Sequence, residues 1–200
     1  MHSINDVIRE KLVLASTSLR RAEILTAVAW PFEVVGSGVD ETRLQSEPPA
    51  SYVRRLAFEK AEAVASRTSS GLVLGADTTV VVSGELLGQP QNAQDARRML
   101  RLLSGQWHEV LTGVALVRAG QQNSSVVDHE RTRVRFGELS EEEIDWYVST
   151  GEPMGKAGAY AVQGKAALFI EEIQGDYFNI VGLPIRLVYE LVRKVQMLSE

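Results

Sequence analysis

The chain contains no cysteine among its 200 residues, which excludes disulfides, thiolate nucleophiles and cysteine-ligated zinc. Its three histidines, His2, His108 and His129, are too scattered to predict a histidine-rich metal site. Apolar runs fall far short of the roughly 20 residues that cross a membrane, and the N-terminus lacks a signal-peptide pattern. We therefore expect a cytoplasmic protein with no membrane partner.

Positive charge is also scarce, with 21 basic against 26 acidic residues and a formal net charge of −5. Nucleic-acid-binding proteins usually carry a basic surface interleaved with aromatic residues, and the sequence has no such stripe. We therefore expect no nucleic-acid partner. A small anionic ligand stays open, because a few local arginines are enough to bind one.

The length of 200 residues fits a single domain spanning 1–200, with room for a smaller lobe around 109–166. Hydrophobic patterns predict strands at 11–15, 32–35, 72–74, 79–82, 109–118, 125–136 and 167–173. Helices are predicted from 18 to 29, from Ser51 onward, over 92–103 and 140–150, and from Pro184 onward. The two long central strands predict a hairpin, so the fold class is α/β with some antiparallel pairing, and an all-parallel doubly wound sheet is not expected.

A serine- and arginine-containing junction, Ala15-Ser-Thr-Ser-Leu-Arg-Arg21, follows an apolar strand and opens a helix. Ser16 and Ser18 are suited to cap that helix, and the N–H groups at its start carry partial positive charge. Arg20 and Arg21 add two cations in the first turn. The junction predicts a triphosphate site, with an ordinary helix cap as the alternative.

Two acidic segments are candidate metal ligands. Asp40 and Glu41 lie in a polar loop after a strand, and Asp77 follows a buried-looking apolar run next to two threonines. Mg²⁺ or Mn²⁺ is typically held by one or two carboxylates together with substrate phosphates and water. Glu41 and Asp77 could together supply that carboxylate shell. The alternative is a solvated loop and a turn-forming aspartate.

Two further segments offer groups for a nucleotide. The glycine-rich stretch 155–164 lets backbone approach a ligand closely, Lys156 can meet a phosphate, and Gln163 offers a donor and acceptors to a base edge. A plain glycine-rich connection is the alternative. Lys60 lies on the helix that starts at Ser51, where a lysine is by default on the solvated face.

Three well-known motifs, for a serine nucleophile, a zinc site and a phosphate-binding loop, are missing from the sequence. Gly-x-Ser-x-Gly, His-Glu-x-x-His and the Walker phosphate loop are all absent. Carboxylates combined with phosphate-binding groups then favour metal-assisted attack of water on a phosphoanhydride, with a nucleotide as the substrate. The residues alone do not identify the bond that is cleaved.

Taken in order, these segments resemble the Maf family of nucleoside triphosphate pyrophosphatases from Leu12 to about Val195. The residues that carry the resemblance are Ala15-Ser-x-Ser-x-x-Arg21, Val39-Asp-Glu41, Lys60 within Phe58–Ala61, Gly75-Ala-Asp-Thr78, Leu103-Ser-Gly105 with His108-x-Val-x-Thr112, Lys156-Ala-Gly-Ala-Tyr160 with Gln163-Gly164, Gly175-Asp-Tyr177 and Asn179-x-Val-Gly-Leu-Pro184. Each motif is weak alone, but their combination in this order is specific.

The resemblance implies a homodimer of α/β subunits, each with a mixed β-sheet flanked by helices and a deep cleft. The implied fold is similar to that of inosine triphosphate pyrophosphatases. It implies hydrolysis of a nucleoside triphosphate to the monophosphate and pyrophosphate with Mg²⁺ or Mn²⁺. The residues implied to grip the triphosphate are Ser16, Arg20, Arg21 and Lys60. Glu41 and Asp77 are implied as metal ligands, with Asp77 also accepting the proton of the attacking water. Gln163 is implied to lie near the base, whereas His108 receives no role.

Two motifs favour the branch of the family that acts on dTTP, UTP and modified uridine triphosphates. They are Ala76-Asp-Thr78 and Tyr160-x-x-Gln-Gly164, where the branch acting on 7-methyl-GTP usually has Ser-Asp-Gln and Ser-Glu-Gly. The 7-methyl-GTP branch remains the alternative substrate assignment.

The chain departs from the family pattern at two positions. Gln89 stands where the family usually has a lysine between glycine and proline, and Gly155 stands where it usually has aspartate. Loss of one charge-assisted contact predicts a slower enzyme rather than an inactive one. A low-turnover nucleotide-binding regulator of cell division, in line with the association of the family with septum formation, is the alternative function.

Overall fold

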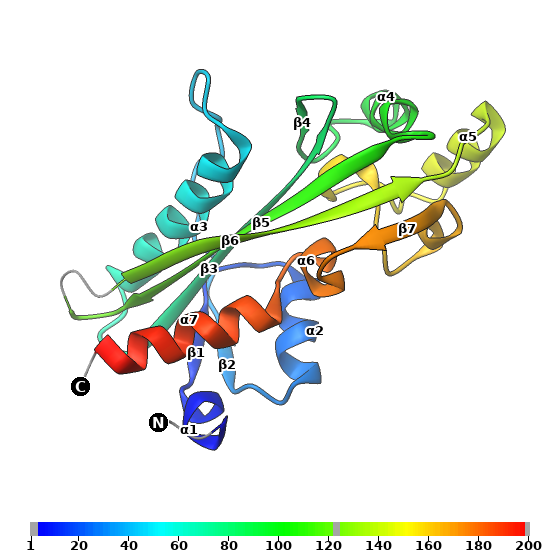
Figure 1. The fold of residues 1–200 in the computed structure, drawn as a ribbon. Coiled ribbons are helices and arrows are strands. Elements are labelled where there is room, and N and C mark those ends of the chain that lie inside the picture. Colours follow the sequence, from blue (N-terminus) through cyan, green and yellow to red (C-terminus); the bar gives the residue numbers. More distant parts are fainter. Residues whose placement is uncertain (1–3, 122–124, 199–200) are drawn as a thin grey trace. The chain divides into compact units, whose positions relative to one another are not determined.

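The computed structural model describes residues 4–121 and 125–198, so His2 lies outside the described residues. Figure 1 shows the elements, which in chain order are α1 (Ile4–Arg9), β1 (Leu12–Leu14), α2 (Leu19–Ala27), β2 (Phe32–Val34), α3 (Pro49–Ala65), β3 (Leu72–Val82), β4 (Glu85–Leu87), α4 (Ala93–Leu103), β5 (Trp107–Arg118), β6 (Ser125–Phe136), α5 (Glu141–Ser149), the 3₁₀ helices η1 (Ala157–Ala159) and η2 (Lys165–Leu168), β7 (Ile170–Gln174), α6 (Tyr177–Val181) and α7 (Ile185–Leu198). No helix within these described ranges is long and apolar enough to cross a membrane.

The strands of the described residues form one seven-stranded mixed sheet in the order β2-β1-β3-β5-β6-β7, with β4 paired to β3. β1 is parallel to both β2 and β3, whereas β4 is antiparallel to β3 and β7 is antiparallel to β6. β5 and β6, of 12 residues each, lie side by side (Figure 1). The expected mixed α/β sheet is therefore confirmed.

The chain divides into two compact units. The first contains Met1–Asp77, Thr112–Glu130 and Gly182–Glu200, and the second contains Thr78–Leu111 and Arg131–Val181. Strands β3, β5 and β6 contribute residues to both units. The single domain over 1–200 with a smaller lobe around 109–166 stays a prediction, as does the deep cleft.

In the first unit, α3 lies directly on the sheet because the residues between them are small. Alanines of α3 pack with Val13 and Val73 in one buried cluster. A Cβ atom on Gly75 of β3 would come within 2.0 Å of the Ala57 carbonyl oxygen, and one on Gly113 of β5 within 2.1 Å of the Val53 carbonyl oxygen. Glycine at both positions therefore lets the backbone of α3 approach the two strands.

In the second unit, two helices begin at the residues that the sequence predicts. Asn92 caps α4, because its side chain accepts a hydrogen bond from the Asp95 amide. Ser140 and Glu143 form a capping box at the start of α5, the helix expected over 140–150. The apolar faces of both helices pack into a buried cluster that includes Phe136.

Three predicted boundaries are wrong. α3 begins at Pro49, after Pro48, rather than at Ser51, because proline pre-sets the backbone angle of a first helical turn. The predicted strands 72–74 and 79–82 are one continuous strand, β3, so Asp77 lies inside a strand instead of at its end. The predicted strand 167–173 begins only at Ile170, because the chain first forms η2.

His108 is buried in the second unit against two aromatic rings. Its Nε2 atom lies 2.8 Å from the Tyr160 hydroxyl oxygen, and its ring packs edge-on against Phe136 and Tyr160. Burial lowers the pKa of His108 from 6.5 to about 4. The imidazole therefore stays neutral in the folded protein at neutral pH, which makes it a packing residue of this cluster.

This burial predicts acid sensitivity. Above about pH 6.5 His108 is neutral in both states, but below it the unfolded chain binds a proton that the folded protein excludes down to about pH 4. We expect the His108 contribution to lower the free energy of unfolding by about 3 kcal/mol across that window. Urea unfolding of the protein and of His108→Gln from pH 4 to 8 measures it, with His129→Gln as control. An equally steep pH dependence in His108→Gln would contradict the assignment.

Candidate active site

Two carboxylates and one lysine meet in the first unit. The Lys60 Nζ atom lies 2.6 Å from Asp77 Oδ1 and 2.6 Å from Glu41 Oε1. Lys60 comes from α3, Asp77 from β3 and Glu41 from the loop after β2. The close approach of α3 to β3 at Gly75 brings Lys60 to Asp77. The default expectation that Lys60 points to solvent is wrong, because its side chain is buried and ion-paired.

One of the two arginines of the serine-containing junction, Arg21, is also buried. Arg21 donates from Nη1 to Ser16 Oγ at 3.0 Å and from Nε to the Gly182 carbonyl oxygen at 2.9 Å. Arg20 is half-buried in the first turn of α2. Ser16 Oγ also accepts from the Ser18 amide at 3.2 Å. Within the described structure the Ser18 side chain does not cap α2, so the cap expected from Ser18 is wrong and the Ser16 hydroxyl organises the junction instead.

The charges of these groups act on one another. Burial raises the pKa of the Asp77 carboxyl, while the nearby cations Lys60 and Arg21 oppose that rise. Burial lowers the pKa of the Arg21 guanidinium, and Asp77 opposes that fall. Arg20 repels Arg21, and Glu41 attracts it. The structure thus brings Arg20, Arg21, Glu41, Lys60 and Asp77 into one electrostatic group in which cations outnumber carboxylates.

The cluster of Arg20, Arg21, Glu41, Lys60 and Asp77 has the features of an anion-binding site that also contains a proton-accepting carboxylate. Cations beside a helix N-terminus attract phosphate oxygens, and Asp77 is a buried carboxylate whose proton affinity burial raises. Glu41 and Asp77 both direct an oxygen at the point that the Lys60 ammonium occupies. Within the described ranges no group of three or more His, Asp or Glu side chains is arranged to hold a metal ion. Glu41 and Asp77 are therefore the pair that could supply protein ligands here.

The other two predicted site residues belong to the second unit. Gln163 is exposed, and Lys156 is half-buried with its Nζ atom donating to the Glu152 carbonyl oxygen at 2.6 Å. The Glu152 carboxylate in turn accepts from the Lys165 amide at 2.9 Å and from the Tyr147 hydroxyl at 3.0 Å. Glu152 therefore ties both ends of the segment that carries Gln163. The shared role of Lys156 and Gln163 with the residues of the first unit stays a prediction.

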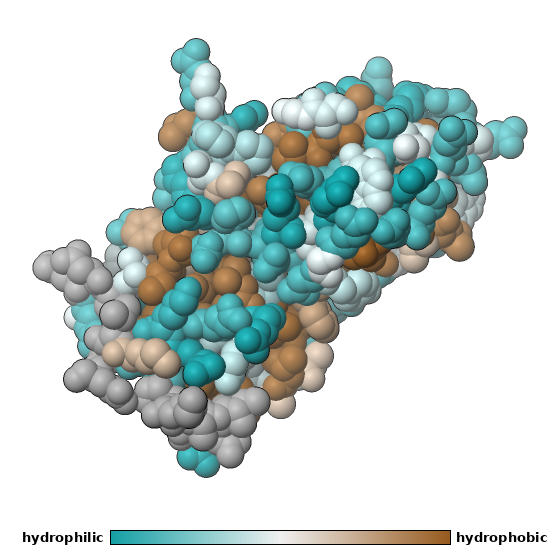
Figure 2. Space-filling model, in the orientation of Figure 1, coloured by the Kyte–Doolittle hydropathy of each residue, from teal (hydrophilic) through white to brown (hydrophobic). Residues whose placement is uncertain are grey.

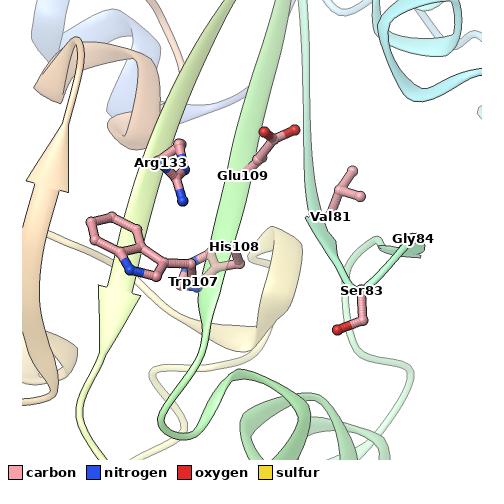
Figure 3. Close-up of a pocket in the computed structure, with 7 residues that line it drawn as sticks. All are labelled: Val81, Ser83, Gly84, Trp107, His108, Glu109 and Arg133. Atoms are coloured by element: carbon pink, nitrogen blue, oxygen red, sulfur yellow. The ribbon is translucent and has the colours of Figure 1, made fainter.

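A separate hollow in the second unit has a volume of about 200 Å³ and is lined by Val81, Ser83, Gly84, Trp107, His108, Glu109 and Arg133. Figure 3 shows Arg133 beside Trp107 on neighbouring strands, and the guanidinium carbon lies 4.6 Å from the ring centroid. None of the predicted site residues lines this hollow. It is small compared with the roughly 300–1,000 Å³ of ordinary ligand sites.

Sequence reasoning missed the residues that hold the loop carrying Glu41. Tyr52 donates from its hydroxyl to the Glu41 carbonyl oxygen at 3.0 Å, and Arg55 forms a two-pronged ion pair with Glu47 at 2.7 and 2.8 Å. The available signal was the spacing of Tyr52 and Arg55, which places them on one face of a helix close to Lys60 in sequence. Their partners lie in an irregular loop that no periodicity predicts.

Comparison with known proteins gives a consistent result. Residues 11–195 match the family model described as Maf-like protein. The chain is 52% identical over 191 residues to a dTTP/UTP pyrophosphatase of Symbiobacterium thermophilum, covering 96% of this chain and 94% of that relative. It is 52% identical over 183 residues to a dTTP/UTP pyrophosphatase of Bacillus cytotoxicus, covering 91% of this chain and 94% of that relative.

Among solved structures, the chain resembles the Ham1 protein of Staphylococcus aureus with a TM-score of 0.51. The match covers 92% of this chain and 99% of that one at 13% sequence identity. At this identity the likeness shows a shared fold and nothing about chemistry.

Proposed function

The chain belongs to the Maf family, and from this membership we propose that it is a nucleoside triphosphate pyrophosphatase acting on dTTP and UTP. Relatives about half identical over most of their length carry the name dTTP/UTP pyrophosphatase. The observation that carries the proposal is the Lys60 ammonium held between Glu41 and Asp77. That arrangement combines a cation suited to bind phosphate, Lys60, with a carboxylate suited to accept a proton, Asp77.

In the proposed reaction, water attacks the α-phosphorus and the α–β phosphoanhydride bond breaks, releasing pyrophosphate. Asp77 accepts the proton of the attacking water, since its burial favours the protonated form. Arg20, Arg21 and Lys60 neutralise the triphosphate and the charge that develops on the leaving group. Ser16 fixes the direction of the Arg21 guanidinium through its hydroxyl.

The residues present fit a divalent cation such as Mg²⁺ or Mn²⁺. Glu41 and Asp77 supply two convergent carboxylate oxygens, the donor type and number that these ions take when phosphates and water complete the shell. When bound, such an ion polarises a phosphoryl oxygen and lowers the pKa of water. Lys60 would then exchange its carboxylate partners for phosphate oxygens.

Base selection is proposed for the second unit. The Gln163 amide offers both a donor and an acceptor, which match the imide edge shared by thymine and uracil. Lys156 adds a cation for the phosphates, although its Nζ atom is also hydrogen-bonded to backbone. The Ala76-Asp-Thr78 and Tyr160-x-x-Gln-Gly164 motifs support this pyrimidine branch.

Product analysis tests the proposal. Purified protein is incubated with Mn²⁺ or Mg²⁺ and dTTP, UTP, 7-methyl-GTP or dATP, and pyrophosphate is resolved from orthophosphate. Pyrophosphate with dTMP or UMP is the expected result. Preference for 7-methyl-GTP would overturn the pyrimidine assignment, and saturable nucleotide binding without turnover would favour a regulator of cell division.

Gln89 provides a test of a phosphate contact. The side chain is exposed at the position where the family usually carries lysine, and a charge-assisted contact contributes about 1.5–3 kcal/mol. If the contact forms only in the transition state, Gln89→Lys is expected to raise kcat for dTTP about tenfold or more. Gln91→Lys, which adds the same charge to another exposed residue two positions away, is the control. Unchanged or lower turnover of Gln89→Lys would refute the contact.

We also propose a cytoplasmic homodimer without nucleic-acid or membrane partners. The homodimer follows from the family resemblance, and exposed apolar side chains such as Leu19 at 77% and Leu168 at 76% are candidates for the subunit contact. Figure 2 shows hydrophobic patches between the hydrophilic residues of one face. Light scattering coupled to size-exclusion chromatography gives the mass directly, and a monomer of 22.0 kDa would overturn the dimer.

A further inference from the structure

The loop between β2 and α3 carries Glu41 but has no helix or strand of its own. The Glu41 carboxylate is 53% exposed, yet its Oε1 atom lies 2.6 Å from Lys60 Nζ. An exposed glutamate in an irregular loop has many accessible conformations. Holding one of them requires that the backbone of the loop be fixed by something else.

Arg55 provides that attachment from α3. Its Nε and Nη2 atoms donate to the two carboxylate oxygens of Glu47 at 2.7 and 2.8 Å, and Nη2 also donates to the Thr42 carbonyl oxygen at 3.3 Å. Its Nη1 atom donates to Glu59 at 3.0 Å. One guanidinium thus joins the residue next to Glu41, the far end of the loop and the helix.

Glu47 closes the loop on itself. Its side chain is only 8% exposed, and its Oε2 atom accepts from the Leu44 amide at 3.3 Å. Its carbonyl oxygen accepts from Arg43 Nη2 at 2.6 Å. The ion pair with Arg55 lowers the pKa of the Glu47 carboxyl, so the contact stays charged at neutral pH. The Arg55–Glu47 pair therefore anchors a loop that already has internal hydrogen bonds.

The helix presents these contacts at regular spacing. Tyr52, Arg55 and Glu59 follow one another at three and four residues, so they share one face of α3. The Tyr52 hydroxyl donates to the Glu41 carbonyl oxygen at 3.0 Å, and the Arg55 guanidinium lies 5.7 Å from the Tyr52 ring. Lys60 follows Glu59 directly. The helix that carries the central ammonium therefore also carries the groups that fix the loop opposite it.

From these contacts we propose that Arg55 is a positioning residue that holds Glu41 in place for catalysis through its ion pair with Glu47. This inference rests on the proposed function, because Glu41 matters only if the site handles a nucleoside triphosphate. Arg55 acts through Glu41 and Glu47 and touches none of the reacting groups named above.

The test combines a structural and a kinetic readout. Hydrogen–deuterium exchange of peptides covering residues 40–47 is expected to accelerate in Arg55→Ala. Arg54→Ala, which removes the same charge from the adjacent exposed residue of α3, is expected to leave that exchange unchanged. Arg55→Lys keeps the charge but cannot form the two-pronged ion pair with Glu47. The exchange rate of residues 40–47 in this variant should therefore lie between the rates in Arg55→Ala and Arg54→Ala.

The kinetic readout is a double-mutant cycle on dTTP hydrolysis. Misplacement of a catalytic group costs about ten- to hundredfold in rate, so Arg55→Ala should lower kcat by that order in the wild-type background. In the Glu41→Gln background the same substitution should lower kcat less than about twofold, because the group it positions is already gone. The KM for dTTP should change far less than kcat.

Each result decides a separate question. Unchanged exchange of residues 40–47 in Arg55→Ala would overturn the positioning role. Equal kcat losses in both backgrounds would also overturn it, because they would show that Arg55 acts independently of Glu41. Absence of pyrophosphate release by the wild-type protein would refute the proposed function instead, and the exchange experiment would still decide whether Arg55 holds the loop.

Discussion

Asp77→Asn is expected to reduce kcat for dTTP hydrolysis by about 10²- to 10⁴-fold, the range supplied by a positioned general base. Asparagine has nearly the same shape as aspartate but cannot accept a proton from water. It also removes one of the two carboxylates that face the Lys60 ammonium. Steady-state kinetics with separate detection of pyrophosphate measures the effect.

Asp145→Asn is the matched control for this substitution. Asp145 is a carboxylate on α5 that is 60% exposed and pairs with Arg97. Its loss should leave kcat within about twofold, because surface ion pairs contribute little. Urea unfolding must show that the Asp77 variant is folded under assay conditions. A folded Asp77→Asn protein with near-normal turnover would exclude Asp77 as the base.

Gly75→Ala is expected to produce a large loss of stability. The new Cβ atom would lie 2.0 Å from the Ala57 carbonyl oxygen and 2.8 Å from the Ala61 amide nitrogen, so α3 must move away from β3. Overpacking of this kind costs about 3 kcal/mol, which lowers the melting temperature by roughly 6–12 °C in a chain of this size. Calorimetry or thermal circular dichroism measures the shift.

Activity should fall together with stability in Gly75→Ala, because α3 carries Lys60. Gly88→Ala is the control, since a Cβ atom at Gly88 meets no described atom within 4 Å. Its free energy of unfolding should change by less than about 0.5 kcal/mol. A Gly75→Ala protein as stable as the wild type would contradict the direct packing of α3 on β3.

Elements with local signals were predictable from sequence. α4 and α5 begin where Asn92 and Ser140 predict, because each cap is formed by residues no more than three positions away. β3 was predicted as two pieces, 72–74 and 79–82, separated by Gly75-Ala-Asp-Thr78, but it is one strand. Gly75 lies where α3 approaches the strand closely, a contact between segments distant in sequence. Such contacts leave no periodicity to detect.

The site was predictable to the same limited degree. Ser16, Arg21, Glu41 and Asp77 were singled out because their types and local spacing suit phosphate or metal. The burial of Lys60 was not predicted, because a lysine on an amphipathic helix is ordinarily solvated. Only the opposing carboxylates of Glu41 and Asp77 keep its side chain buried. Arg55 and Glu47 were missed because their pairing depends on how an irregular loop returns to a helix.

The ammonium group between Glu41 and Asp77 also bears on which anions the protein tolerates. A dissolved monoanion such as chloride would have to displace carboxylates that are already fixed beside Lys60. Its binding free energy is then only the difference between its own attraction to the ammonium and the similar attraction of the carboxylate that it replaces. In the proposed site, a chain of linked phosphates presents several charges at once and would meet Arg20 and Arg21 as well as Lys60. The built-in carboxylates therefore act as competitors that discriminate against small, singly charged ions, and abundant cellular salts should inhibit the protein only weakly.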